Sequence, residues 1–171
     1  MLFSYSYIKI PVLMRVIERQ RALGKPIRLI VLKARQIGLS TLTEGMLFHR
    51  TATSFNTDSL IVAHREDSTN NLFQMSKLFY DELPVPIKPL LKTSNAYELR
   101  FENPTKDPSE KKREPGLRSK IRCVTAGGRG IGRSYTCNNV HISEYAFWDG
   151  DKKATLAGLL QAVHIILTQW C

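Results

Sequence analysis

The residues best suited to chemistry lie in a short turn, where Gly38 is followed by the hydroxyl residues Ser40 and Thr41. A turn that binds phosphate needs a strand, a glycine-bearing loop and a helix whose first N–H groups point at the phosphate oxygens. The usual pattern is Gly-x4-Gly-Lys-Ser/Thr, and Gly38 and Ser40 match it. Lys33 stands in place of the first glycine and Leu39 in place of the lysine, so half of the defining positions deviate.

The absent lysine has a physical consequence, because phosphate oxygens still require a nearby cation. Lys33 could reach across the phosphates from the start of the loop, and the guanidinium of Arg35 could hold two oxygens at once. Ser40 would keep its place on Mg²⁺. On the pattern alone, an ordinary strand-to-helix connection with Ser40 or Thr41 as the helix N-cap is equally consistent. If the turn binds phosphate, the nucleotide-binding residues are Lys33, Ala34, Arg35, Gln36, Ile37, Gly38, Leu39, Ser40 and Thr41.

Glu144 is the second candidate for chemistry. It follows the apolar segment Asn139–Ile142, which is typical of a short buried strand. A carboxylate at the carboxyl end of such a strand lies where ligands bind in open α/β sheets, and Mg²⁺ prefers one or two carboxylates together with water. The alternative is a surface carboxylate that merely follows a strand. The two motifs in this order favour a joint ATP site.

Alternating strands and helices must position these residues. Apolar runs rich in β-branched residues predict strands, and apolar residues at helical spacing predict helices. Residues 97–101 and 119–124 alternate in polarity and predict paired strands, joined by a mobile basic loop over residues 103–118. The whole pattern predicts an α/β domain with a mainly parallel sheet flanked by helices. After a helical lead-in over residues 1–24, the other expected elements are helix Pro11–Leu23, strand Ile27–Leu32, helix Thr41–Arg50, strand Ser59–Ala63, helix Asp67–Leu83, strand Asn139–Ile142 and helix Lys152–Val163.

The composition fits one domain and a polyanionic partner. The chain has 171 residues, 43% of them hydrophobic, and has no apolar stretch long enough to span a membrane. Its three cysteines are too scattered for a disulfide framework or a zinc site and favour a reducing cytoplasm. A formal net charge of +10 favours nucleic acid over a basic surface with no partner. One basic cluster could contact DNA phosphates or stay solvated: Lys106, Lys111, Lys112, Arg113, Arg118 and Lys120.

Two segments resemble the large terminase subunits, the DNA-packaging motors of tailed phages. The run Lys33–Thr41 resembles their variant Walker A motif, in which the lysine moves to the start of the loop. The run Asn139–Trp148 resembles their Walker B region, with Ser143 where the general pattern has aspartate. The resemblance extends over residues 19–163 and implies a P-loop NTPase fold of the RecA/ASCE type, with ATP and Mg²⁺ as cofactors.

The resemblance also implies roles for single residues. Glu144 would polarise the attacking water, and Ser143 would hold Mg²⁺ through a water molecule. Terminases have an Arg-Gly segment where Arg129 lies, so Arg129 could sense the γ-phosphate, act on the ATP of a neighbouring subunit or contact DNA. A flexible basic loop explains that segment equally well. The family also has an upstream glutamine that reads adenine, and the one upstream glutamine here, Gln20, lies inside a predicted helix.

We therefore expect the Mg-dependent ATPase domain of a phage or prophage DNA-packaging motor in the bacterial cytoplasm. The implied partners are double-stranded DNA, the portal protein, the small terminase subunit and further copies of the chain in a ring on the portal, with no membrane. Two alternatives stay open, namely another P-loop ATPase that translocates DNA and a catalytically inactive terminase fragment that binds DNA or a partner. The resemblance ends near His164, which favours a C-terminally truncated domain without a nuclease domain, or a slip of the reading frame at that point.

Overall fold

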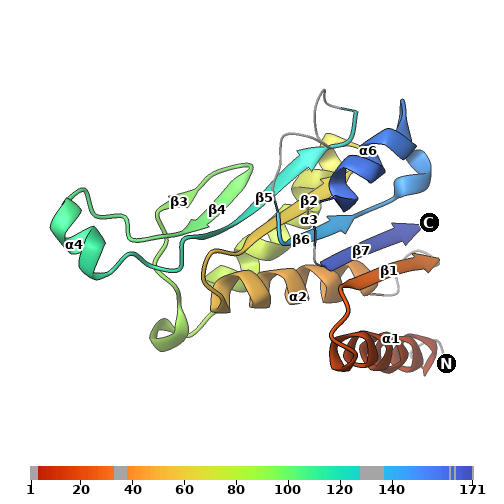
Figure 1. Ribbon diagram of the computed structural model, residues 1–171, viewed down its shortest axis with the longest axis horizontal. Helices are drawn as coiled ribbons and strands as arrows, with labels where there is room; N and C mark the ends of the chain where they lie inside the picture. Colours follow the sequence, from red (N-terminus) through yellow and green to blue (C-terminus); the bar gives the residue numbers. More distant parts are fainter. Residues whose placement is uncertain (1–3, 33–37, 128–136, 162, 164, 171) are drawn as a thin grey trace.

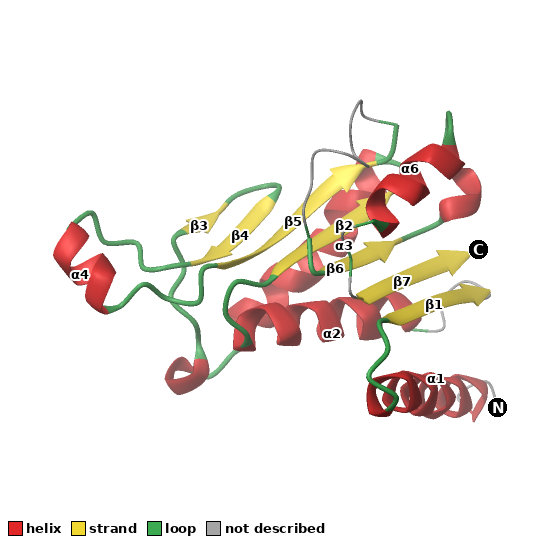
Figure 2. Cartoon of the chain, viewed as in Figure 1, coloured by secondary structure: helices red, strands yellow, loops and turns green. Residues whose placement is uncertain are grey.

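The computed structural model describes residues 4–32, 38–127, 137–161, 163 and 165–170, which form a sheet with helices on both faces (Figures 1 and 2). No helix in these residues is long and apolar enough to cross a membrane. The strands are β1 (Ile27–Leu32), β2 (Asp58–Ala63), β3 (Thr93–Ser94), β4 (Glu98–Phe101), β5 (Ser119–Thr125), β6 (Asn139–Ile142) and β7 (Ile165–Trp170). The helices are α1 (Ser4–Ala22), α2 (Leu39–Thr53), α3 (Glu66–Asp81), α4 (Pro108–Arg113) and α6 (Lys152–Leu160), with 3₁₀ turns η1 (Val85–Ile87) and η2 (Tyr145–Phe147).

The sheet is parallel over most of its width. Its described strands follow the order β1-β7-β6-β2-β5-β4-β3. Every pairing from β1 to β5 is parallel, and β4 and β3 add antiparallel pairs beyond β5. Because the parallel strands share one direction, their carboxyl ends lie at one edge, where Figure 1 shows their arrowheads together.

Each face of the sheet has its own core. Helices α1, α2 and α3 cover one face, while α6 and η2 cover part of the other (Figure 2). Strand β2 serves both cores, because Ile61 and Ala63 belong to the first and Leu60 and Val62 to the second, all at 0% exposure. Burial on both faces explains why residues 60–63 of this strand are all apolar rather than alternating.

The predicted α/β class is confirmed, and β1 and β6 have their predicted bounds. Strand β1 is buried on one face only, with Ile30 75% exposed and Leu32 83% exposed, because Ile27 and Leu29 belong to the first core and no β1 residue belongs to the second. Several features differ from expectation. Strand β7, which no pattern predicted, pairs between β1 and β6. Helix α1 begins at Ser4, so Pro11 lies inside it and not at its start.

The segment 103–118, predicted as a loop, carries the short helix α4 and projects from one end of the sheet (Figure 1). Asp107 caps α4 by accepting a hydrogen bond of 2.8 Å from the main-chain N–H two residues later. Pro108 occupies the first turn, where its missing N–H costs nothing. At the base, the side-chain amide of Asn103 donates to the carbonyl of Glu114 at 2.8 Å. We call residues 103–118, which these contacts hold together, the α4 arm.

Replacing Gly116 with alanine should destabilise the base of the α4 arm more than the same change at Gly150 destabilises the chain. Both have positive φ, 72° and 73°, where an L residue is strained by about 1–2 kcal/mol. A Cβ on Gly116 would also lie 2.8 Å from the nitrogen of Asn103, whereas one on Gly150 meets no atom within 4 Å. Urea denaturation should show losses of about 2–4 kcal/mol for Gly116→Ala and about 1–2 kcal/mol for Gly150→Ala. Equal losses would contradict this close packing.

Candidate functional site

Three connections deliver polar groups to the carboxyl edge of the sheet. Gly38 precedes α2 after β1, His64 follows β2, and Ser143 and Glu144 follow β6. Strands β2 and β6 are direct neighbours, and β7 separates β6 from β1. Ligand sites of open parallel sheets are assembled at such an edge from connections of this kind.

The first turn of α2 has the features of an anion site. Gly38, its N-cap, has φ 72° and ψ 4°, a left-handed conformation that glycine adopts without a steric penalty. Among the residues that the structure describes, no side chain caps α2. The side chain of Leu39 is buried, Ser40 is half-buried and Thr41 is exposed. The alternative prediction of Ser40 or Thr41 as N-cap is wrong, because α2 already begins at Leu39.

Several predicted site residues lie outside the described part of the chain. They are Lys33, Ala34, Arg35, Gln36, Ile37 and Arg129. The described part of the turn therefore offers the main-chain N–H groups of α2 and the hydroxyls of Ser40 and Thr41. The roles of the cations Lys33 and Arg35 stay predictions.

A mainly apolar cavity of about 880 Å³ lies beside the turn, between α1 and α2. It reaches Gly38 and Thr41 and is bordered on the α1 side by Met14. Its volume falls within the range of small-molecule sites, roughly 300–1,000 Å³. The amide of Gln20 is engaged elsewhere, because its Oε1 accepts a hydrogen bond of 3.0 Å from the main-chain N–H of Arg28. Gln20 thus ties α1 to β1.

A buried polar pair joins α2 to β6 directly behind the turn. A carboxylate oxygen of Glu44 contacts Nδ1 of His141, and both side chains are 0% exposed. Nε2 of His141 has no hydrogen-bond partner among the described residues. Burial raises the pKa of the Glu44 carboxyl, while His141 and the Ser76 hydroxyl oppose that shift. Separating the pair would leave each group alone in the core, which is costly.

The buried pair sets the register between α2 and β6. Ser40 lies one helical turn before Glu44 on the same face, about 6 Å nearer the start of α2. Ser143 lies two residues past His141 on the same side of the chain, about 6.6 Å further along the strand. Because α2 connects the parallel strands β1 and β2, it runs opposite to β6, and both steps lead toward the same edge. From this register we expect the two predicted Mg²⁺ ligands, Ser40 and Ser143, to lie at similar heights above the sheet edge.

Glu144 stands at a sharp turn after β6. Its φ of 53° and ψ of 41° are left-handed, which is uncommon for a residue with a Cβ. The turn is fixed by three hydrogen bonds, from Ser143 N–H to Val62 O (2.8 Å), from Trp148 Nε1 to Ser143 O (3.0 Å) and from Phe147 N–H to Glu144 O (2.9 Å). Strained backbone of this kind clusters at functional sites. The Glu144 side chain is 24% exposed and is accessible to a ligand.

His64 reaches Glu144 from the end of β2. Its Nδ1 lies 2.6 Å from Oε2 of Glu144, and its ring packs against Phe147 with centroids 5.9 Å apart. Neither His64 nor Glu44 was expected to act from the sequence. The available signal for His64 was its place directly after a buried strand, since residues that follow parallel strands meet at one edge. For Glu44 the available signal was its position four residues after Ser40, which puts both residues on one face of a helix.

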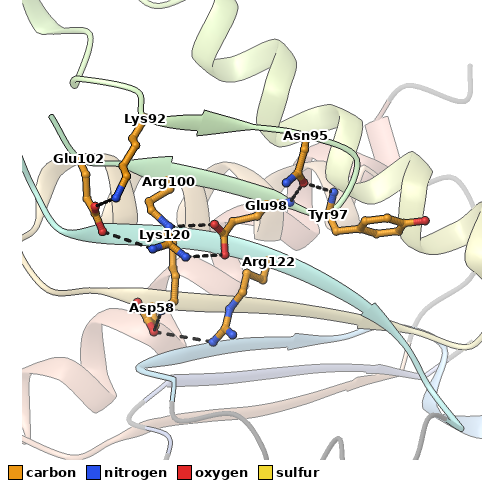
Figure 3. Close-up of polar contacts among 9 residues, drawn as sticks. All are labelled: Asp58, Lys92, Asn95, Tyr97, Glu98, Arg100, Glu102, Lys120 and Arg122. Carbon is orange, nitrogen blue, oxygen red and sulfur yellow. Dashed lines mark hydrogen bonds and ion pairs between the residues drawn. The ribbon is translucent and has the colours of Figure 1, made fainter. Parts of the chain in front are cut away.

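One member of the predicted basic cluster, Lys120, takes part in a group of ion pairs across β2, β4 and β5 (Figure 3). Nζ of Lys120 lies 3.0 Å from a carboxylate oxygen of Asp58, and a guanidinium nitrogen of Arg122 lies 3.7 Å from the same oxygen. Nε of Arg100 lies 2.8 Å from Oε1 of Glu98. Lys120 therefore belongs to a ladder of ion pairs, whereas the other members of the cluster lie on or beside the α4 arm.

Two solved structures are similar to the chain. One is an arginine-to-alanine mutant of the large terminase ATPase domain of Thermus phage P74-26, with a TM-score of 0.55, 14% identity and coverage of 85% of this chain and 60% of that chain. The other is the large terminase ATPase domain of the same phage, with a TM-score of 0.49, 17% identity and coverage of 83% and 59%. No protein-family model and no curated protein matches the sequence. The first likeness shows that the chain has the fold of a terminase ATPase domain, and the chain spans 60% of that structure's length.

Replacing Glu44 with glutamine should remove a pH dependence of stability. Burial raises the pKa of Glu44 in the folded chain above its ordinary value of 4.5, so the folded state binds this proton more tightly than the unfolded state. The resulting stabilisation is fully present below the unfolded-state pKa and is lost as pH rises through the folded-state pKa. Urea denaturation at a series of pH values should show that the wild-type chain loses stability relative to Glu44→Gln above about pH 4.5. A relative gain with rising pH would contradict a carboxyl group penalised by burial.

Proposed function

We propose that the chain is the ATP-hydrolysing part of a viral DNA-packaging motor. The observation that carries this proposal is that the glycine turn at Gly38 and the carboxylate of Glu144 both lie at the carboxyl edge of a sheet with the fold of a terminase ATPase domain. A fold alone does not determine function, so the proposal depends on this site. The name of the similar Thermus phage structure, a large terminase ATPase domain, supports this class of motor.

The residues at the edge fit ATP with Mg²⁺. The N–H groups of the first turn of α2 would face the phosphates, favoured by the helix dipole, and Lys33 and Arg35 would add positive charge. Ser40 would bind Mg²⁺ directly and Ser143 through water, and the apolar cavity beside Gly38 has room for a base. When bound, Mg²⁺ would neutralise the charge that develops on the phosphates during transfer.

Glu144 would orient the attacking water and accept its proton. A general base must be held within hydrogen-bond reach of the proton that it removes, and small displacements of positioning groups are costly in rate. The buried contact between Glu44 and His141 supports such a fixed geometry, because it ties the helix at the phosphates to the strand that carries Glu144.

Double-stranded DNA is the proposed substrate of the motor. The portal protein and the small terminase subunit are its proposed partners, with copies of the chain arranged in a ring. The net charge of +10 supports electrostatic attraction to DNA. The α4 arm presents exposed cations at its last turn, Lys112 and Arg113, and is a candidate contact with the DNA backbone. Arg129 is the residue proposed to act on ATP in its own or a neighbouring copy, or on DNA.

Replacing Glu144 with glutamine should stop hydrolysis and spare binding. Glutamine keeps the shape of the side chain but cannot accept the proton, so kcat should fall by roughly 100-fold or more. Phosphate release in the presence of double-stranded DNA measures the rate, and a fluorescent ATP analogue measures binding. The exposed Glu66 on α3 provides a matched control, and Glu66→Gln should change neither the rate of hydrolysis nor the affinity for the analogue. A folded wild-type chain without ATPase activity at any DNA concentration would favour an inactive binding fragment instead.

Replacing Lys33 with alanine should weaken ATP binding. Its cation is proposed to face the phosphates in place of the lysine that Leu39 replaces, so the Kd for ATP should rise roughly tenfold or more, corresponding to about 1.4 kcal/mol for each factor of ten. Titration with the fluorescent analogue measures the shift. Lys25→Ala, at an exposed lysine before β1, should leave the Kd unchanged. An unchanged Kd for Lys33→Ala would exclude Lys33 as the phosphate-binding cation.

A further inference from the structure

His64 makes a direct contact with the proposed catalytic carboxylate that the nucleotide site itself does not explain. His64 follows β2, and Glu144 follows β6, the strand that pairs with β2 in parallel. The two side chains are 17% and 24% exposed, and Nδ1 of His64 lies 2.6 Å from Oε2 of Glu144. The sheet therefore brings an imidazole against one oxygen of this carboxylate.

The contact requires a proton on His64 Nδ1. Both Nδ1 of His64 and Oε2 of Glu144 are shielded from solvent, and neither makes a hydrogen bond of regular geometry among the described residues, so their approach at 2.6 Å is a close polar contact. Two unprotonated acceptors would repel one another at 2.6 Å, so one of the two atoms must carry a proton. A carboxylate that acts as a base is ionised and only accepts, which assigns the proton to the imidazole.

The imidazole ring is itself held in place. Phe147, in the turn that follows Glu144, packs against the His64 ring with centroids 5.9 Å apart and planes inclined by 44°. The main-chain N–H of Phe147 donates to the carbonyl of Glu144 at 2.9 Å. His64, Glu144 and Phe147 thus form a small closed set in which each member restricts the other two.

We propose that His64 is a positioning residue that fixes Oε2 of Glu144 and so leaves the other carboxylate oxygen, Oε1, to take the proton of the attacking water. This inference rests on the proposed ATPase function. Although the two contacting atoms are shielded, both side chains are partly exposed, and a polar pair of partly exposed side chains adds little stability. The role of the contact is therefore orientation of the base, and its loss should reduce turnover more than folding or ATP binding.

The test compares His64→Ala with His64→Asn, because the side-chain amide of asparagine can place a nitrogen donor near the position of Nδ1. We expect His64→Ala to lower kcat for ATP by roughly 10- to 100-fold, part of the roughly 100- to 10,000-fold that a positioned base supplies. The KM for ATP should change by less than about twofold, as for an interaction that acts on turnover rather than on ground-state binding. His64→Asn should recover kcat to within about threefold of wild type, a rescue expected where the donor matters and the ring does not. Asn71→Ala, at an exposed position on α3, should change neither parameter.

Combining the changes separates this inference from the proposed function. In a Glu144→Gln background, His64→Ala should cause no further loss, because the group that it positions is already disabled. Losses that multiply, or a full kcat for His64→Ala beside an inactive Glu144→Gln, would overturn the positioning role and leave the ATPase proposal standing. Full activity of Glu144→Gln would overturn both. Thermal unfolding and analogue binding identify a variant that fails to fold. If His64→Ala fails to fold, the kcat of His64→Asn is the test, and a kcat within about threefold of wild type supports the positioning role.

Discussion

The geometry of the site depends on one buried contact, between Glu44 on α2 and His141 on β6. Removing one partner of a fully buried ionisable pair typically costs about 3–5 kcal/mol, because the other is left in the core without compensation. The pair therefore holds helix and strand in one register. The glycine turn lies before Glu44 on the helix, and Ser143 and Glu144 lie after His141 on the chain. The most constrained packing thus stands directly behind the proposed chemistry, as a preorganised site requires.

The carboxyl edge of the sheet and the open face of β4 and β5 are stabilised by different contacts. At the carboxyl edge, a strained turn at Glu144 is fixed by main-chain hydrogen bonds and by the contact with His64. On the open face of β4 and β5, half-exposed acids and bases neutralise one another (Figure 3). Such surface pairs contribute little stability. The α4 arm extends beyond that face and carries the exposed cations.

Local patterns were sufficient to predict most of the framework and the two motifs. The apolar runs Ile27–Leu32 and Asn139–Ile142 are strands with the expected bounds, and the rule that ligands bind at carboxyl ends of parallel strands placed Gly38 and Glu144 at one edge. The pairings of His64 with Glu144 and of Glu44 with His141 join residues far apart in the chain, and no periodicity encodes them. Strand β7 carries an apolar start at Ile165, but its pairing between β1 and β6 is a long-range choice. Helix α4 has six residues, which is too short for a helical periodicity of apolar residues to be recognised in the sequence.

The central claim is that the turn at Gly38 and the carboxylate of Glu144 form a single nucleotide site. The most direct measurement is a crystal structure of the chain with Mg²⁺ and a non-hydrolysable ATP analogue. The account predicts that the β- and γ-phosphates lie on the first N–H groups of α2, that Mg²⁺ lies between Ser40 and Ser143, and that an ordered water near the γ-phosphate contacts Glu144. Phosphates bound away from the start of α2, or a γ-phosphate beyond the reach of any water held by Glu144, would contradict it.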